Sequence, residues 1–203
     1  MSRTQNRPLP LGIMSLKFSY AIVIVLLILG SVLLLLINLK CMLLGFSAFI
    51  SYVFIYTPMK SKSAWAVFVG AFPGAIPPFL GAIAATDAFG FLPGVLFFIQ
   101  FTWQFPHFWA LAWVSHDDYQ KAGYQLLPSS LGRSKQSAFQ ILIYSIALIP
   151  FSLIPWLLDW TGNTTFVIAA LLGTLFFIYA YKLYISQEDS DERKLMLASF
   201  VYL

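Results

Sequence analysis

The sequence predicts an all-α protein that crosses a lipid bilayer several times. Of its 203 residues, 60% are hydrophobic and only 10% are charged, whereas a soluble domain carries about 25% charged residues. So few charges cannot cover a globular surface, and we therefore expect that surface to face lipid. The net charge of +4 does not indicate nucleic acid, because the basic residues fall between apolar runs of membrane-spanning length.

Apolar runs follow one another along the chain at the length that a membrane requires. A bilayer core of about 30 Å is crossed by about 20 apolar residues in a helix. Together the runs predict one transmembrane domain over residues 1–203, and the short last run predicts that the chain stops inside a helix. The expected spans are 18–38, 41–56, 64–85, 92–114, 138–158 and 164–185, with a partial span at 195–203.

The basic residues are distributed very unevenly over the predicted loops. Because consecutive spans alternate in direction, the loops form two sets, and one set holds all of the 12 basic residues except Lys40. Short loops rich in Lys and Arg remain on the cytoplasmic side of a membrane. We therefore expect the loops 57–63 and 115–137 to be cytoplasmic, and any chemistry to lie on that face.

Prolines and glycines interrupt the third apolar run. Pro73, Pro77 and Pro78 each remove a backbone donor, and in lipid the freed carbonyls must find partners in neighbouring helices or at a cavity. With Gly74 and Gly81 nearby, the pattern predicts either a kinked helix in close packing or a helix bent around a cavity.

The fourth run carries polar residues that share one helix face. Gln100, Gln104 and His107 are spaced i, i+4, i+7. Polar groups inside a membrane are costly, usually face the bundle interior and mark function. With Asp117 and Asp118 beyond the run, we expect a polar stripe from an acidic mouth to a buried imidazole. The alternatives are a core histidine bonded to a backbone carbonyl and an acidic pair that is only a solvated helix end.

Adjacent carboxylates at a membrane surface can hold Mg²⁺, which often shares its oxygen ligands with substrate phosphates. Basic residues are expected on the same face, where arginine fits phosphate in a planar fork and lysine acts as a point charge. Carboxylates, Mg²⁺ and cations above an apolar bundle suit a lipid with a diphosphate head, whose departure they would stabilise. These basic residues are Arg3, Arg7, Lys60, Lys62 and Lys121.

Five short motifs occur in one order along the chain. They are residues 3–9 (RTQNRPL), 56–60 (YTPMK), 73–78 (PGAIPP), 106–111 (PHFWAL) and 117–123 (DDYQKAG). In this order they resemble the motifs of the heme O synthase family, the protoheme IX farnesyltransferases among the UbiA-type intramembrane prenyltransferases. The resemblance extends from Arg3 almost to Leu203.

The resemblance implies a fold, substrates and a location. It implies a bundle of nine transmembrane helices in the lipid bilayer of a bacterial cytoplasmic (inner) membrane, with the active face cytoplasmic. It implies farnesyl diphosphate and heme B as substrates and Mg²⁺ as the metal. The implied reaction adds a hydroxyethylfarnesyl group at a heme vinyl to give heme O, which a heme A synthase or terminal oxidase would receive.

The resemblance also implies roles for individual residues. Asp117 and Asp118 match the family's second acidic motif, which implies metal binding, and His107 matches the histidine of the proline-histidine-phenylalanine motif. The expected catalytic residues are Asp117, Asp118 and His107; the diphosphate-binding residues are Arg3, Asn6, Arg7, Lys60 and Lys121; the substrate-lining residues are Gln100, Gln104, Tyr56 and Tyr119.

The sequence departs from the family pattern in two places. The first Asp-rich motif would precede residue 3 and the ninth helix is cut, so we expect a fragment that is inactive by itself. Ala122 stands where the wider superfamily has a further acidic residue, which favours heme O synthases over the alternative of another UbiA-type quinone or aromatic prenyltransferase. The other alternative is a non-enzymatic heme-handling or transport protein. Transporters are often built from two repeats that resemble each other in sequence, and we find no such repeat between the two halves of this chain.

Overall fold

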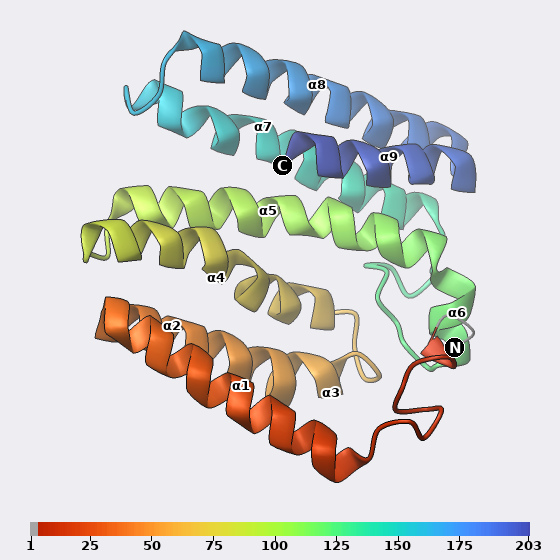
Figure 1. Ribbon diagram of the computed structural model, residues 1–203. Coiled ribbons are helices and arrows are strands. Elements are labelled where there is room, and N and C mark those ends of the chain that lie inside the picture. The colour runs from red at the N-terminus through yellow and green to blue at the C-terminus, as the bar shows by residue number, and fades with distance from the viewer. Residues whose placement is uncertain (1–3) are drawn as a thin grey trace.

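The computed structural model describes residues 4–203, and all regular structure in that part of the chain is helical (Figure 1). The expected all-α fold is confirmed, whereas Arg3 lies outside the described residues. In chain order the helices are α1 (Leu16–Ile37), α2 (Leu39–Ile50), a π-helical turn (Ser51–Tyr56), α3 (Thr57–Met59), α4 (Ala66–Thr86), α5 (Phe91–Val114), α6 (His116–Lys121), α7 (Lys135–Leu157), α8 (Asn163–Ser186) and α9 (Asp189–Tyr202).

Within the described residues, five helical segments are long and apolar enough to cross a membrane. They are Leu16–Ile37, Leu39–Met59, Ala66–Thr86, Lys135–Leu157 and Asn163–Ser186. They coincide with five of the six full spans expected from the sequence. Helix α5 has 24 residues but is not among the five, because its glutamines and its histidine make it less apolar, so its crossing stays a prediction.

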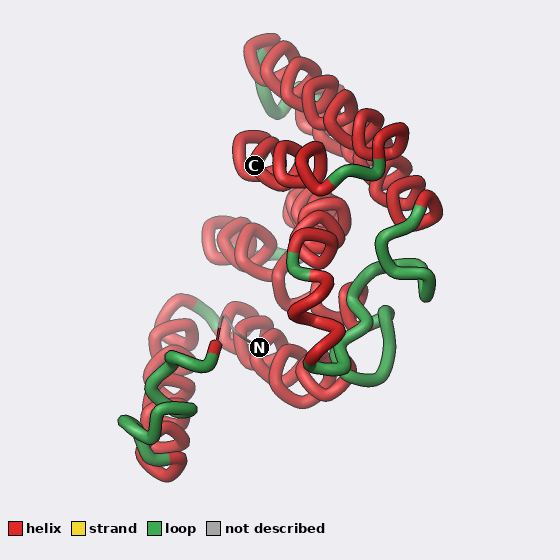
Figure 2. The backbone as a smooth tube through the Cα atoms, turned by 90° about the vertical axis from the view of Figure 1, so that its right-hand side faces the viewer, coloured by secondary structure: helices red, strands yellow, loops and turns green. Residues whose placement is uncertain are grey.

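The long helices alternate in direction and form a curved row that does not close on itself (Figure 2). Neighbours in the row are α1 and α2, then α4, α5, α7 and α8, and the last helix, α9, packs against both α5 and α8. Helix α5 therefore stands near the middle of the row, with α4 on one side and α7 and α9 on the other.

The connections between helices gather at two opposite ends of the row. The N-terminal segment, α3, α6 and the link from α8 to α9 lie at one end, on the right in Figure 1, and the links α1–α2, α4–α5 and α7–α8 lie at the other. The two sets of loops expected from the charge pattern are thus two ends of the molecule. At the second end Lys40 pairs with Asp87, with Nζ 3.0 Å from Oδ1.

Burial rises steeply from the edge of the row to its centre. None of the residues of α1 is buried, whereas α5 buries Trp103, Phe105, Trp109 and Trp113 against α4, α7 and α9. Small residues let these helices approach closely, as is usual in membrane bundles. At Gly173 of α8, for example, an added Cβ would lie 3.0 Å from Cγ1 of Ile149.

Candidate functional site

A cavity of about 430 Å³ lies between α2, α4, α5 and the π-helical turn. Its volume is within the range of small-molecule sites, about 300–1,000 Å³. Aromatic rings form much of its wall, and one amide and two hydroxyl groups are the polar side-chain groups. The lining residues are Ala48, Phe49, Tyr52, Tyr56, Gly70, Pro73, Gly74, Gln104 and Phe108.

Helix α4 shapes this cavity through two glycines one turn apart. It stays helical across its three prolines, packs closely on its neighbours and borders a cavity. A Cβ at Gly70 would lie 2.6 Å from Cε2 of Tyr56, and one at Gly74 would lie 1.9 Å from Oε1 of Gln104. The glycines therefore let both side chains lie directly against the α4 backbone.

Gln104 is buried beside this cavity and its amide is bonded to backbone. Nε2 donates to the carbonyl of Ala71 at 2.9 Å and to that of Gln100 at 3.3 Å. The three prolines leave the carbonyls of Val69, Pro73 and Gly74 without their helical donors, so Gln104 does not bond to one of these freed carbonyls. Its two hydrogen bonds instead satisfy the buried amide and link α5 to α4.

The π-helical turn presents two tyrosines to the cavity. Pro58 cannot donate a backbone hydrogen bond, and the N–H and the hydroxyl of Thr57 both donate to the carbonyl of Tyr52. The resulting wider turn, of a kind frequent at functional sites, places the rings of Tyr52 and Tyr56 5.2 Å apart.

Lys60 joins this cavity to the basic end of the molecule. Its Nζ lies 4.2 Å from the ring centroid of Tyr56 and 5.6 Å from that of Tyr52, a cation–π geometry. Partial burial lowers the pKa of Lys60. An ammonium group therefore stands over the tyrosine that lines the cavity.

The predicted acidic pair lies on the short helix α6, at the same end. Asp117 is exposed, and its Oδ2 is 3.6 Å from Nη2 of Arg133. Asp118 is half-buried, and Lys121 is exposed at the last turn of α6. The predicted diphosphate-binding residues Asn6 and Arg7 are exposed in the turns that precede α1.

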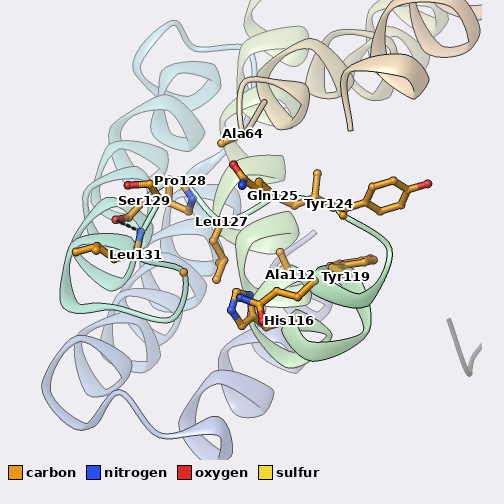
Figure 3. A pocket seen from close by; sticks show the side chains of 15 residues that line it. Ala64, Ala112, His116, Tyr119, Tyr124, Gln125, Leu127, Pro128, Ser129 and Leu131 are labelled. Atoms are coloured by element: carbon orange, nitrogen blue, oxygen red, sulfur yellow. Dashed lines mark hydrogen bonds between the residues drawn. The ribbon is translucent and has the colours of Figure 1, made fainter. Parts of the chain in front are cut away.

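A second cavity, of about 630 Å³, lies between α6 and the loop that follows it (Figure 3). Tyr119 of the acidic motif lines it together with His116. Gly132 has a left-handed backbone, and a Cβ there would lie 2.8 Å from the His116 ring, so glycine allows the loop to close over the imidazole. Burial and then the charge of Arg133 lower the pKa of His116.

The metal ligands predicted from the sequence are the two carboxylates Asp117 and Asp118. Among residues 4–203 no group of three or more His, Cys, Asp or Glu side chains is placed to hold a metal ion. Mg²⁺ is commonly bound by one or two protein carboxylates together with substrate phosphates and water. Asp117 and Asp118 fit that kind of shared site and do not form a complete protein cage.

His107 lies on a different side of α5 from Gln104. Its Nδ1 is 2.7 Å from Oγ of Ser199 on α9, and its ring stacks on Trp103 with centroids 4.6 Å apart. The single polar stripe expected from the sequence is therefore wrong: Gln104 faces α4, whereas His107 faces α9. Three residues turn a helix by about 300°, so the two side chains point about 60° apart around the axis of α5. That difference is enough for one side chain to meet α4 and the other to meet α9.

The sequence did not single out Arg133 and Glu192 as site residues. Arg133 was counted only in the charge bias, but it contacts α5, α6 and α9. Glu192 is fully buried at the start of α9, and neither carboxylate oxygen has a hydrogen-bond partner. Burial, and then the charge of Asp189, raise the pKa of Glu192 to about 8.

Fold and site together define a multi-pass helical membrane protein with an aromatic cavity, a lysine beside it and a carboxylate pair at the same end. The model of the UbiA prenyltransferase family matches residues 1–203, and the chain belongs to this family. No solved structure matches the chain.

Curated relatives match the chain over its whole length. A protein named protoheme IX farnesyltransferase from Cytophaga hutchinsonii is 45% identical over 204 residues, which are 100% of this chain and 71% of the relative. Proteins of the same name from Flavobacterium psychrophilum and Solibacter usitatus are 43% and 41% identical, and the match covers 100% of this chain and 69% and 70% of the relatives.

Proposed function

We propose that this chain carries the site of the protoheme IX farnesyltransferase reaction, in which a farnesyl group passes from farnesyl diphosphate to a vinyl group of heme B, water adds the hydroxyl group, and heme O and free diphosphate are formed. The name of the relatives supports the reaction. The observation that carries it is the aromatic cavity of about 430 Å³ whose Tyr56 wall lies beneath the Lys60 ammonium. Farnesyl diphosphate has an apolar tail, which an aromatic cavity can hold, and an anionic head, which a lysine ammonium can bind.

Each group in the chain has a role in this proposal. The farnesyl tail lies along Phe49, Phe108 and Tyr52, and the tyrosine faces shelter the allylic cation that forms when diphosphate leaves. Lys60 donates hydrogen bonds to the diphosphate, and Gln104 holds the wall of α4 in place. The further diphosphate contacts come from Arg3, Asn6, Arg7 and Lys121.

Asp117 and Asp118 are the proposed Mg²⁺ ligands of the chain. When bound, Mg²⁺ supplies charge neutralisation for the departing diphosphate. The carboxylates would hold the ion at the basic end of the row, beside the cations that the diphosphate needs. By the positive-inside rule this end faces the cytoplasm, here across a bacterial inner membrane. Heme O would pass from it to a heme A synthase or a terminal oxidase.

The test compares two aspartates at opposite ends of the molecule. The chain is expressed as it stands and also grafted into the Cytophaga relative in place of the matched segment, in a bacterium that lacks heme O synthase. Heme O is then measured by chromatography. Asp118→Asn should lower heme O at least a hundredfold, because metal-assisted stabilisation contributes several kcal/mol and about 1.4 kcal/mol is a factor of ten in rate.

Asp87→Asn is the matched control. Asp87 has a left-handed backbone, which asparagine tolerates, and it lies at the end far from the acidic pair, so heme O should stay unchanged. If Asp118→Asn forms heme O at the normal rate, then the acidic pair is only a solvated helix end and does not bind the metal. Absence of heme O from both unmutated forms would reject the reaction.

A further inference from the structure

Arg133 joins three helices at the basic end of the molecule. Its Nε donates to the carbonyl of Trp113 at 2.9 Å, and its Nη2 to that of Val114 at 3.5 Å. Nη1 is 3.6 Å from Oδ2 of Asp189, which also accepts a hydrogen bond from the Trp113 indole on its Oδ1. Carbonyls at a helix C-terminus lack partners within the helix and carry partial negative charge, so α5 holds the guanidinium in place.

The remaining contact of Arg133, with Asp117, is weak. Nη2 is 3.6 Å from Oδ2 of Asp117 and that carboxylate side chain is 73% exposed, whereas a good charge-assisted bond is about 2.7–2.9 Å long. An exposed pair of this kind adds little to stability. Nη2 therefore lies beside the acidic pair while Nε fixes the base of the group, and it can change partner without releasing the anchor.

We propose that Arg133 is a diphosphate-binding residue of the site at Asp117 and Asp118, which rests on the function proposed above. Its Nη2 leaves Asp117 for a phosphate oxygen when the diphosphate arrives, because the planar guanidinium matches phosphate geometry.

The charges at the site predict in which direction Arg133 changes the affinity for each ligand. Two carboxylates and one Mg²⁺ sum to zero, and a bound diphosphate brings about three negative charges. Arg133 therefore favours the assembled complex of metal and diphosphate. Without diphosphate the same positive charge repels the metal ion and competes for Asp117. Arg133 thus makes the metal and the diphosphate bind together and disfavours the metal alone.

The experiment measures the two ligands separately on the purified chain, in both forms described above. Farnesyl diphosphate binding is measured by equilibrium binding of the radiolabelled compound with Mg²⁺ and without heme. Mn²⁺ alone is measured by electron paramagnetic resonance. Arg133→Ala should weaken diphosphate binding about tenfold, the scale of one charge-assisted hydrogen bond. Mn²⁺ alone should bind equally well or about twofold more tightly.

Two further variants control for charge and for folding. Arg133→Lys keeps the charge without the planar fork, so it should recover part of the diphosphate affinity. Lys135→Ala removes a cation two residues away that lies over the Tyr184 ring at 5.1 Å and should leave both affinities unchanged.

The outcomes separate this inference from the proposed reaction. If Arg133→Ala weakens the binding of Mn²⁺ and of diphosphate equally, then Arg133 only stabilises the fold. If neither affinity changes, then Arg133 is not part of the site. Either result overturns the inference. Weaker diphosphate binding together with Mn²⁺ binding that is unchanged or tighter supports it even if no heme O is formed. Heme O formation with diphosphate affinity unaffected by Arg133→Ala would keep the reaction and reject the inference.

Discussion

The two sides of α5 use polar residues for opposite purposes. Toward α4, the Gln104 amide donates hydrogen bonds to backbone carbonyls at the edge of a cavity of about 430 Å³. Toward α9, His107 and Trp103 both bond to Ser199, at 2.7 Å and 2.8 Å, and Phe200 packs on the imidazole at 4.8 Å. One side leaves space for a ligand and the other fills its space with aromatic rings.

The difference shows what a polar residue in an apolar helix means. Burial and hydrogen bonding are alike on the two sides, since Gln104 and His107 are 2% and 8% exposed. The facing residues differ: Gly70 and Gly74 oppose the cavity side, whereas Ser199 and Phe200 oppose the other. Both residues link α5 to a neighbouring helix, but Gln104 also borders a cavity, whereas the surroundings of His107 are filled.

The largest expected effect comes from filling the cavity side. Gly74→Val adds branched carbon where a Cβ would already lie 1.9 Å from Oε1 of Gln104, so the side chain must take space from the cavity. We expect about a hundredfold loss of heme O formation, the cost of a misplacement of about 1 Å in a positioned substrate. Insertion into the membrane, followed by immunoblot, should persist.

Gly81→Val provides the matched control for that substitution. Gly81 is on the same helix, and no heavy atom lies within 4 Å of a Cβ placed there. Its activity should remain close to that of the unmutated chain. Equal losses in the two variants would show that valine disturbs α4 in general and would remove the argument for a ligand in this cavity.

The sequence predicted the parts of the molecule that depend on local chemistry. Apolar length and charge act on each segment separately, so the all-α fold and the gathering of Lys60, Asp117 and Lys121 at one end followed from the sequence. The cavity beside α4 was one of the two alternatives predicted from its prolines and glycines.

The parts that were missed depend on tertiary partners. Helical spacing puts Gln104 and His107 near one face, and only the arrangement of α4 and α9 on either side of α5 separates them. Glu192 stands among charged residues in the sequence, but the packing of α9 buries it. Arg133 is remote in sequence from Asp189, and only the fold brings these two residues together.

The side of α5 toward α9 should affect stability more than chemistry. His107→Ala removes a bond to Ser199 and a ring stacked on Trp103, and we expect a loss of about 2–4 kcal/mol from the hydrogen bond and the cavity together. Thermal unfolding in detergent measures it. Heme O formed per folded molecule should change little.

Ser199→Ala tests the same contact between α5 and α9 from the side of α9. It removes the partner of Nδ1 without removing the ring, so its cost should be smaller, about 1–2 kcal/mol. If His107→Ala is as stable as the unmutated chain but forms no heme O, then the imidazole acts at the substrate, as the resemblance of its motif implied.

The last effect is a pH dependence of stability, which we expect at Glu192, where α9 begins. The pKa of its carboxyl is raised from 4.5 to about 8 by burial first and then by Asp189, whereas Arg133 and Arg193 act in the opposite direction. A carboxyl whose folded pKa is raised stays protonated in the folded state while the unfolded state ionises. Its stability contribution is therefore complete below about pH 4.5 and is lost as the pH rises toward 8.

Glu192→Gln keeps the size of the side chain and removes this titration. The unmutated chain should lose thermal stability steadily between pH 5 and pH 8, and the variant should lose less over the same range. Below about pH 4.5 the two should be equally stable, because a neutral carboxyl and an amide are similar in polarity. At pH 7 the variant should be the more stable of the two, because it keeps the stability that the unmutated chain loses as the pH rises. Glu188→Gln, at an exposed position on the same segment, should keep the slope of the unmutated chain. An identical slope in Glu192→Gln would mean that the carboxyl is ionised in the folded protein and that α9 is held differently at its first turn.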